Sequence, residues 1–402
     1  MIFKLKINRV IYKMTISILV IMLSCCNSVE NIDENKSELQ FLADGKLRYL
    51  ELCGTPYERG LSHGKLLKED IKSVTDSLLI DIERTTNTDA YTFISKFLDE
   101  TDFLTEINKW TPEILDEIKG ISDGSGIDYK VILMHQLGDE FFFNTEYIMA
   151  HKCSSIGINK TDKHSSIAAQ NMDIPIYFHG YQTVMKIIDE NELEYLILTI
   201  PGHIGITGMN NHSVSINCNI LMQLDYQRKG LPVSFIVRGV LKQNNFEEAI
   251  NFIEKIEHAS GQNYLIAGKD KVVSLECSAT KVKEFKPFEN AIFTYHTNHP
   301  ITNDSFSKRY LEILNEHNLK LEEALSFCQR IPSFKERFSE KTKDFGVEEI
   351  KEVLSSVDHE GFDVISNNLT YASVIYVLED NPTYLISPGK PHETDYLKLT
   401  FK

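Results

Sequence analysis

The chain has 402 residues, of which 42% are hydrophobic and 25% are charged. This composition is typical of a globular protein and excludes a disordered or collagen-like chain. The formal net charge is −16 and the basic side chains do not gather into a marked patch, so we expect no nucleic-acid binding, because phosphate contacts are made chiefly by clustered Lys and Arg.

The first 26 residues differ from the rest of the chain. Four basic residues between Lys4 and Lys13 precede an apolar run from Met14 to Leu23. This pattern predicts a secretory signal over residues 1–24, and the run is short for a membrane span.

The signal ends in VIMLSCC, which resembles a bacterial lipobox, where the cysteine after the cut becomes the lipidated N-terminus. Cys25 is the preferred lipid site and Cys26 the second choice, with a plain signal peptide as the alternative. Residues 25–44 would then form a flexible tether. We therefore expect an exported lipoprotein of a bacterial cell envelope, periplasmic or surface-facing, held at the membrane by its N-terminal lipid.

Residues 45–152 carry a helical pattern. A helix is predicted from TPYERGLSHGKLLKEDIKSVTDSLLIDIERT, where Thr55 is a helix cap, Pro56 is the first helical residue, and apolar residues recur every three and four. A similar pattern follows in TPEILDEIKGISDGSGIDYKVILMHQLGDE. We expect an N-terminal helical segment that ends just before Cys153.

After Cys153 the hydrophobic period changes to two. Hairpins are predicted from SSIGINK with SSIAAQNMD, from YQTVMKIID with LEYLILTI, and from HIGITGM with SVSINCNIL. Helices are expected in PVSFIVRGVLKQ and FEEAINFIEKIE, further strands in NYLIAG, VVSLECS and AIFTYHTNHP, and a last hairpin in SVIYVLEDNPTYLISPG. Strands in runs and helices in runs indicate antiparallel sheets with helices layered on them, and residues 153–402 are expected to form this core.

Cys153 stands where the period changes and is followed by small residues. A hairpin partner strand would bring Asp173 and the amides of QNMD beside it. The plain alternative is a small buried hydrophobe, which is the usual role of a cysteine. The other cysteines beyond the signal are irregularly spaced and form no CxxC pair, so neither a disulfide framework nor a zinc site is predicted.

The stretch CSSIGI...AAQNMD resembles the N-terminal nucleophile (Ntn) hydrolases of the acyl-coenzyme A:6-aminopenicillanic acid acyltransferase and linear amide C–N hydrolase family, relatives of choloylglycine hydrolases, penicillin V acylases and acid ceramidase. The same family is matched in order by GTPYERGLSHG, GMNNHSVSINCN, LPVSFIVRGVLKQNNFEEAINFIEK, GQNYLIAG, YHTNHP and NLTYASVIYVLEDNPTYLISPGKPHET. The resemblance covers roughly residues 48–396. It implies an α+β fold, an αββα sandwich of antiparallel sheets with an N-terminal helical segment, and a precursor that cuts itself between Lys152 and Cys153.

The same resemblance implies roles for single residues. Cys153 is the nucleophile, Asp173 holds the freed amino group, Asn298 in HTNHP donates to the oxyanion, and Arg309 in SFSKRYLEIL orders the nucleophile region. Lys152 departs from the glycine that precedes the nucleophile in the best-known member.

The resemblance also implies a site asparagine at the end of the strand SVSINCN. Asn219 fits best, with Asn217 on the same strand face as the alternative.

Four further residues are expected to bind substrate: Gln170, Asn171, Asp139 and Glu140. For Asp139 and Glu140, which precede the cut, assistance to cleavage is the alternative. Choloylglycine hydrolases usually carry arginine at the position of Gln170, whereas the penicillin-acyltransferase branch has glutamine. This residue favours the second branch.

An N-terminal cysteine can supply both nucleophile and base. The freed α-amino group has a pKa of about 7.7–8 and can take the thiol proton near neutral pH. The thiolate attacks an amide carbonyl, and water or an amine resolves the thioester. We predict a hydrolase of linear N-acyl amides that needs no cofactor. The alternatives are an acyltransferase that uses an amine acceptor and a non-catalytic surface binding lipoprotein of the same fold.

Two histidine patterns are weaker. His296 and His299 are three residues apart at a strand end beside Pro300, without a clear third ligand, so no metal site is predicted. His151 is the alternative base in an uncut chain, although neighbouring residues of a strand point to opposite faces. The sequence leaves open the acyl and amine parts of the small-molecule substrate, and the oligomeric state.

Overall fold

The computed structural model describes residues 37–145, 153–189, 192–326, 328, 330–339, 345–357 and 365–401. The predicted signal, the lipid sites Cys25 and Cys26, and the residues His151 and Lys152 lie outside these ranges. No helix within them is both long enough and apolar enough to cross a membrane.

A hairpin precedes the helical segment. Strands β1 (Glu38–Leu42) and β2 (Leu47–Leu52) pair antiparallel around a turn with left-handed backbone at residues 43–45. This corrects two expectations, that residues 25–44 are a tether throughout and that residues 45–152 are helical throughout. The backbone groups of these strands are satisfied by pairing at one edge of a sheet.

The described part of the chain then forms seven helices before Cys153: α2 (Pro56–Leu66), α3 (Lys68–Thr86), α4 (Ala90–Glu100), α5 (Phe103–Trp110), α6 (Glu113–Ser125), α7 (Tyr129–His135) and α8 (Gly138–Asn144). Thr55 caps α2 as predicted, in a reciprocal capping box with Glu58. Helices α2 and α6 touch through glycines, because a Cβ on Gly60 would lie 1.9 Å from the carbonyl oxygen of Glu117.

The larger sheet has nine strands within the described ranges, in the order β1-β2-β5-β6-β7-β8-β9-β10-β11. Its neighbours are antiparallel except for β2 and β5, which pair in parallel. The strands after the first hairpin are β5 (Thr183–Ile188), β6 (Glu194–Thr199), β7 (Thr207–Asn210), β8 (Ser215–Ile220), β9 (Gln262–Ala267), β10 (Val272–Cys277) and β11 (Val282–Phe285).

The smaller sheet is antiparallel and runs β12-β3-β4-β13-β14-β15 in the same described part of the chain. Its strands are β12 (Phe293–His296), β3 (Ser154–Ile158), β4 (Ser166–Asp173), β13 (Thr370–Leu378), β14 (Thr383–Ser387) and β15 (Leu397–Thr400).

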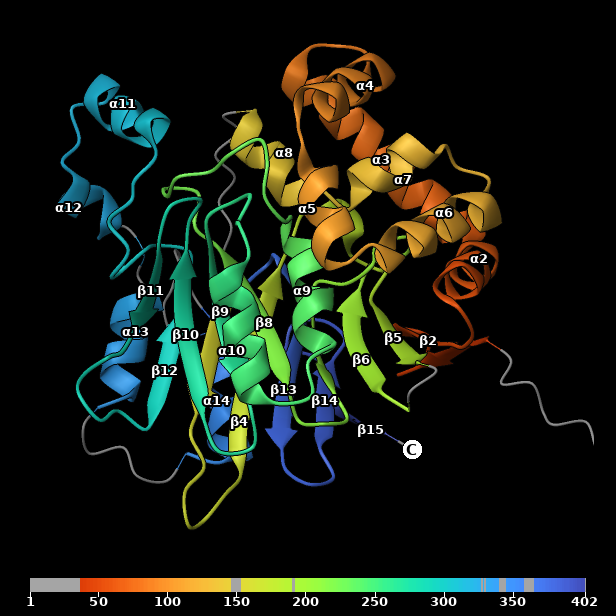
Figure 1. Cartoon of the computed structure of the whole chain (residues 1–402). Helices are drawn as coiled ribbons and strands as arrows, with labels where there is room; N and C mark the ends of the chain where they lie inside the picture. Colours follow the sequence, from red (N-terminus) through yellow and green to blue (C-terminus); the bar gives the residue numbers. More distant parts are fainter. Residues whose placement is uncertain are drawn as a thin grey trace, which may run out of the picture. The chain divides into compact units, whose positions relative to one another are not determined.

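Helices cover the outer faces of both sheets, with α9 and α10 against the larger sheet and α13 and α14 against the smaller one (Figure 1). The elements that complete the fold are η1 (Ile176–Phe178), α9 (Val233–Leu241), α10 (Phe246–Lys255), α11 (Lys308–Glu316), α12 (Leu321–Leu325), α13 (Arg330–Arg337) and α14 (Val347–Leu354).

The apolar clusters follow these layers. Met172 of β4 packs between the sheets in one cluster with Leu265 of β9. On the other face of β4, Ile167 packs in a cluster with Phe334 of α13. Both faces of β4 are therefore buried, which explains its nearly continuous apolar and small residues. The layers confirm the predicted αββα sandwich, with the one parallel pair as an exception to antiparallel pairing.

Candidate active site

Cys153 immediately precedes β3, beside the end of β4. The register pairs Ser154 with Asn171, so Cys153 comes opposite Met172. The Cys153 Sγ lies 3.6 Å from Met172 Sδ, and the thiol donates to the carbonyl oxygen of Asp173, also at 3.6 Å. The β3–β4 hairpin thus brings Cys153 and Asp173 together.

The Cys153 thiol is only 5% exposed. Burial and the Asp173 carboxylate raise its pKa to about 12, although the Asp173 carbonyl and the Arg330 guanidinium oppose the rise. In the uncut chain the nitrogen of Cys153 belongs to a peptide bond and is not a base. The thiol is therefore protonated at neutral pH and needs a base before it can act as a nucleophile.

Asp173 is held by a residue that the sequence analysis did not single out. Its carboxylate is buried, and Asn367 Nδ2 donates to Asp173 Oδ2 at 2.5 Å. Asn367 lies just before β13, the strand that pairs with β4. The carboxylate is thereby fixed at the end of β4, next to the nucleophile.

Arg330, the first residue of α13, occupies the site where an arginine was expected. It is 1% exposed, and its Nη1 donates to the carbonyl oxygen of Cys153 at 2.5 Å and to Ser154 Oγ at 3.1 Å. Its Nη2 donates to Asn298 Oδ1 at 3.3 Å. Arg330 therefore joins the nucleophile segment to the predicted oxyanion donor, and its full burial is understandable only because it is paired.

Arg309 lies elsewhere. It is on α11, its side chain is 32% exposed, and it forms ion pairs with Glu312 at 3.8 Å and Glu316 at 3.3 Å on the same helix. The expectation that Arg309 orders the nucleophile is corrected in favour of Arg330. Both arginines lie at the start of a helix, so the local pattern did not separate them.

Asn298 follows β12 and is 5% exposed. Its side-chain Nδ2 donates to the carbonyl oxygen of Ile220 at 3.1 Å, and its own carbonyl accepts from Gln223 Nε2 at 3.1 Å. Ile220 lines the cavity at Cys153, so this bond ties Asn298 to a residue of the cavity wall.

Asn219 reaches the nucleophile strand and Asn217 does not. Asn219 Oδ1 accepts from Ser155 Oγ at 2.7 Å and from Asn263 Nδ2 at 3.1 Å, while Asn217 Nδ2 donates to Thr207 Oγ1 at 3.0 Å. The Asn219 Nδ2 is buried and has no hydrogen-bond partner within the described residues. A buried donor without a partner is unusual, although Asn219 is not among the described lining residues of the cavity.

Gln170 and Asn171 point to opposite faces of β4. Gln170 Nε2 donates to the carbonyl oxygen of Cys218 across the sandwich. Asn171 Nδ2 donates to the carbonyl oxygens of Leu354 at 2.8 Å and Ile365 at 2.9 Å, toward α14. Neither residue lines the cavity, which corrects the expectation that they contact substrate; here they hold the strand that carries Asp173.

A cavity opens at Cys153 and encloses about 940 Å³, including its mouth. Most of its wall is apolar and includes Leu78, Phe141, Phe178, Ile200, Val233 and Val237. Three aspartates, Asp81, Asp139 and Asp173, also line it, whereas none of its described lining residues is Lys or Arg. Such a wall suits an apolar group that carries no negative charge.

Asp139 lies in this wall, and Glu140 lies behind it. Asp139 Oδ2 accepts from Gln262 Nε2 at 2.7 Å, and burial raises its pKa to about 6. Glu140 Oε1 accepts from the backbone N–H of Val233 at 3.1 Å and from Ser260 Oγ at 2.9 Å; burial and the Asp139 charge raise its pKa to about 8. Only Asp139 is therefore placed to meet substrate, and Glu140 supports the start of α9.

Two buried histidines at the cavity are neutral. Burial lowers the pKa of His135 to about 4 and holds that of His203 well below its usual range. His203 Nδ1 accepts from the backbone N–H of Gly205 at 3.2 Å, so its Nε2 carries the proton and donates to Ser234 Oγ at 3.1 Å. This tautomer cannot deprotonate Ser234, which excludes a Ser–His pair as the catalytic group here.

Comparison with known proteins agrees with the motifs. The family described as acyl-coenzyme A:6-aminopenicillanic acid acyl-transferase matches residues 159–374, more than half of the chain. The matched range contains Asp173, Asn298 and Arg330 and begins after Cys153. "Protein dcd1A" from Dictyostelium discoideum is 29% identical over 246 residues, covering 52% of this chain and 53% of that protein, so the chain spans about half the length of this relative.

Two solved structures are similar at lower identity. A variant of conjugated bile acid hydrolase from Clostridium perfringens is 14% identical, with 61% of this chain and 92% of that chain covered and a TM-score of 0.40. Penicillin V acylase from Agrobacterium tumefaciens is 14% identical, with 61% and 86% covered and a TM-score of 0.37. From the family match over more than half of its length, the chain belongs to the acyl-coenzyme A:6-aminopenicillanic acid acyl-transferase family.

Proposed function

We propose that this chain is a cysteine amidase that hydrolyses linear N-acyl amide bonds through a thioester on Cys153. One arrangement carries the proposal: the Cys153 thiol lies at the wall of an apolar cavity, with Asp173, Asn298 and Arg330 around it. Family membership supports an activity of the amidase or acyltransferase type.

Activation begins with cleavage of the bond between Lys152 and Cys153. The amide nitrogen of Cys153 then becomes an α-amino group with a pKa of about 7.7–8, a suitable base at neutral pH. The helical segment stays attached after the cut, because Glu117 of α6 forms a buried bidentate pair with Arg238 of α9, at 2.7 and 2.8 Å. Two polypeptides would thus remain one folded unit.

The free amino group takes the proton of the Cys153 thiol, and the thiolate attacks the amide carbon. The carbonyl oxygen becomes an oxyanion that the side-chain amides of Asn298 and Asn219 stabilise. The ammonium group then returns the proton to the leaving nitrogen, the amine departs, and a thioester remains. Water, deprotonated by the same amino group, releases the acid and restores the thiol.

The cavity indicates the kind of acyl group. Its wall is mainly aliphatic and aromatic, so burial of an apolar chain supplies the binding free energy. Because aspartates line it and its described lining contains no Lys or Arg, an acyl group with a negative charge is disfavoured. We therefore propose amides of uncharged, apolar acids as substrates.

Acyl transfer is the second candidate, and the family description favours it. It uses the same thioester and differs only in whether water or an amine resolves it. The ratio of free acid to new amide, measured with increasing amine acceptor, separates the two reactions. An amide-dominated product at low acceptor concentration would replace hydrolysis as the main activity.

The place of action remains a proposal from the N-terminal pattern. We propose export and lipidation at Cys25, followed by attachment to the bacterial cell envelope. Mass spectrometry of the N-terminal peptide tests this, since an acylated Cys25 supports it and an intact, unmodified N-terminus contradicts it.

The function is tested by amine release from a panel of neutral N-acyl amides. Wild type is expected to hydrolyse the members with apolar acyl groups, and Cys153→Ala is expected to lose about 10⁴-fold or more in kcat. Cys53→Ala is the matched control, because Cys53 lies in the N-terminal part of the chain and outside the cavity wall. Full activity of Cys153→Ala on every active substrate would contradict the proposal.

A further inference from the structure

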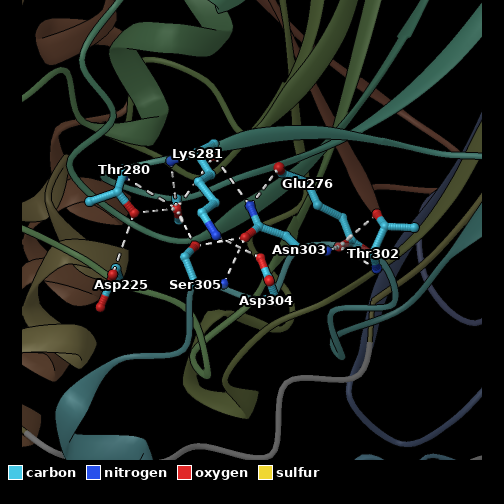
Figure 2. A network of polar contacts seen from close by, with 9 residues as sticks. Asp225, Glu276, Thr280, Lys281, Thr302, Asn303, Asp304 and Ser305 are labelled. Atoms are coloured by element: carbon cyan, nitrogen blue, oxygen red, sulfur yellow. Dashed lines mark hydrogen bonds and ion pairs between the residues drawn. The ribbon is translucent and has the colours of Figure 1, made fainter.

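Glu276 of β10 lies completely buried under the loop that follows β12. Its carboxylate accepts from the backbone N–H groups of Ile301 at 2.6 Å, Thr302 at 2.9 Å and Asn303 at 2.6 Å, and from Thr302 Oγ1 at 3.2 Å. Its fifth partner is His296 Nε2 at 2.8 Å. Figure 2 shows Glu276 pointing at Thr302 and Asn303.

The His296 ring is buried between Glu276 and the backbone of Thr297. Its Nε2 faces the Glu276 carboxylate and its Nδ1 faces the carbonyl oxygen of Thr297 at 2.8 Å. Burial raises the pKa of Glu276, but the hydrogen bond and charge of His296 and the backbone N–H donors outweigh it and lower the pKa overall.

The side chain of Asn303 makes a second set of hydrogen bonds in the same loop. Asn303 Nδ2 donates to the carbonyl oxygens of Glu276 at 3.0 Å and Lys281 at 3.2 Å, and Asn303 Oδ1 accepts from the N–H and the hydroxyl of Ser305 at 3.0 and 2.6 Å (Figure 2). The outer edge of this network is an exposed pair, Lys281 with Asp304 at 2.8 Å. The loop is thus rigidly bonded inside and solvated outside.

These contacts hold the chain on both sides of Asn298. His296 lies two residues before Asn298, and Ile301 to Asn303 lie three to five residues after it. His296 also ends the strand that pairs with Ser155 of the nucleophile strand. Glu276 is not among the described lining residues of the cavity, so it is placed to act on the loop and not on the substrate directly.

We propose that Glu276 and His296 are positioning residues that set the place of the Asn298 side-chain amide. The inference rests on the proposed function, in which Asn298 stabilises the oxyanion. A donor misplaced by less than 1 Å loses much of its effect, because oxyanion stabilisation depends on preorganised geometry.

Glu276→Gln tests this with little change in shape. The glutamine amide nitrogen is a donor and would face donors of the loop, so part of the network must break. We expect kcat to fall about 10- to 100-fold while KM changes less than about threefold. Asp304→Asn, at the exposed edge of the same loop, is the matched control and should keep kcat within about twofold.

A double-mutant cycle distinguishes positioning from general damage. Asn298→Ala alone should cost about 100- to 1,000-fold in kcat. In the Asn298→Ala background, Glu276→Gln should lower kcat by less than about twofold, since its effect passes through the missing side chain. If the loss of kcat in the double variant equals the product of the two single losses, the inference is overturned.

A second readout does not depend on activity. Hydrogen exchange at the amides of Ile301, Thr302 and Asn303 should speed up in Glu276→Gln relative to Asp304→Asn.

The outcomes separate the function from the inference. If wild type hydrolyses no amide, the proposed function fails. Unchanged protection of the three amides in Glu276→Gln would overturn the loop restraint separately. If Cys153→Ala abolishes activity but Glu276→Gln keeps full kcat, the function stands and the inference falls. Should Glu276→Gln not fold, His296→Gln replaces it with the same expected results.

Discussion

The two sides of the candidate site are held by different interactions. Cys153 and Asp173 are held by the backbone pairing of β3, β4 and β13, which consists of many hydrogen bonds. Asn298 and Arg330 are placed by a few buried side chains that connect segments far apart in the sequence. A single substitution should therefore disturb the second side far more than the first.

The largest effect expected from this difference is at Arg330. Arg330→Gln removes the guanidinium that bonds to the Cys153 carbonyl and to Asn298 and that opposes the rise of the Cys153 pKa. We expect kcat/KM to fall about 100- to 1,000-fold. Steady-state kinetics on a cleaved amide measures this directly.

Arg309→Gln is the matched control for that prediction. Arg309 is partly exposed and pairs with exposed carboxylates of its own helix, so kcat/KM should stay within about twofold. A larger loss at Arg309 than at Arg330 would reverse the assignment of the site arginine.

A smaller effect is expected on stability, from a residue that the helical segment contributes to the cavity wall. Asp139→Asn removes a charge from the cavity wall but keeps an acceptor for Gln262. Because burial raises the pKa of Asp139 to about 6, above about 3.9 when unfolded, its ionisation opposes folding above pH 6, and this penalty vanishes below about pH 4. The Asp139 charge also raises the pKa of Glu140. The substitution therefore removes the cost of burying the Asp139 charge and the repulsion between the two carboxylates.

The variant should therefore be more stable than wild type at pH 8, on the order of 1–3 kcal/mol, and about equal at pH 4. Urea unfolding at the two pH values measures the difference. Asp270→Asn, in an exposed pair with Lys160, should change stability by less than about 0.5 kcal/mol at both. A gain for Asp139→Asn that does not depend on pH would contradict the charge argument.

The same contrast explains what the sequence could predict. The alternation in SSIGINK and SSIAAQNMD and the turn between them predict the hairpin, and its register carries Cys153 to Asp173. This hairpin is local, so residue spacing along the chain is enough to predict it. The role of Asn298 after β12 comes instead from the resemblance of HTNHP to the family.

The other site residues could not be predicted, because their roles depend on contacts between segments far apart in the sequence. Arg330 lies 177 residues from the Cys153 carbonyl that it binds, and an arginine at a helix start has no signal that marks it as buried. Glu276 reads as an ordinary strand residue until the loop after β12 folds over it. Asn171 was expected at the substrate, but the period of two turns it to the face opposite Gln170.

The central claim is that Cys153 becomes an N-terminal nucleophile. The most direct test is intact mass of the purified protein under denaturing conditions, with N-terminal sequencing of each fragment. Two fragments, one of them beginning at Cys153, are the predicted result. A single unbroken chain that nevertheless hydrolyses amides would contradict the account, because the α-amino base would then be missing.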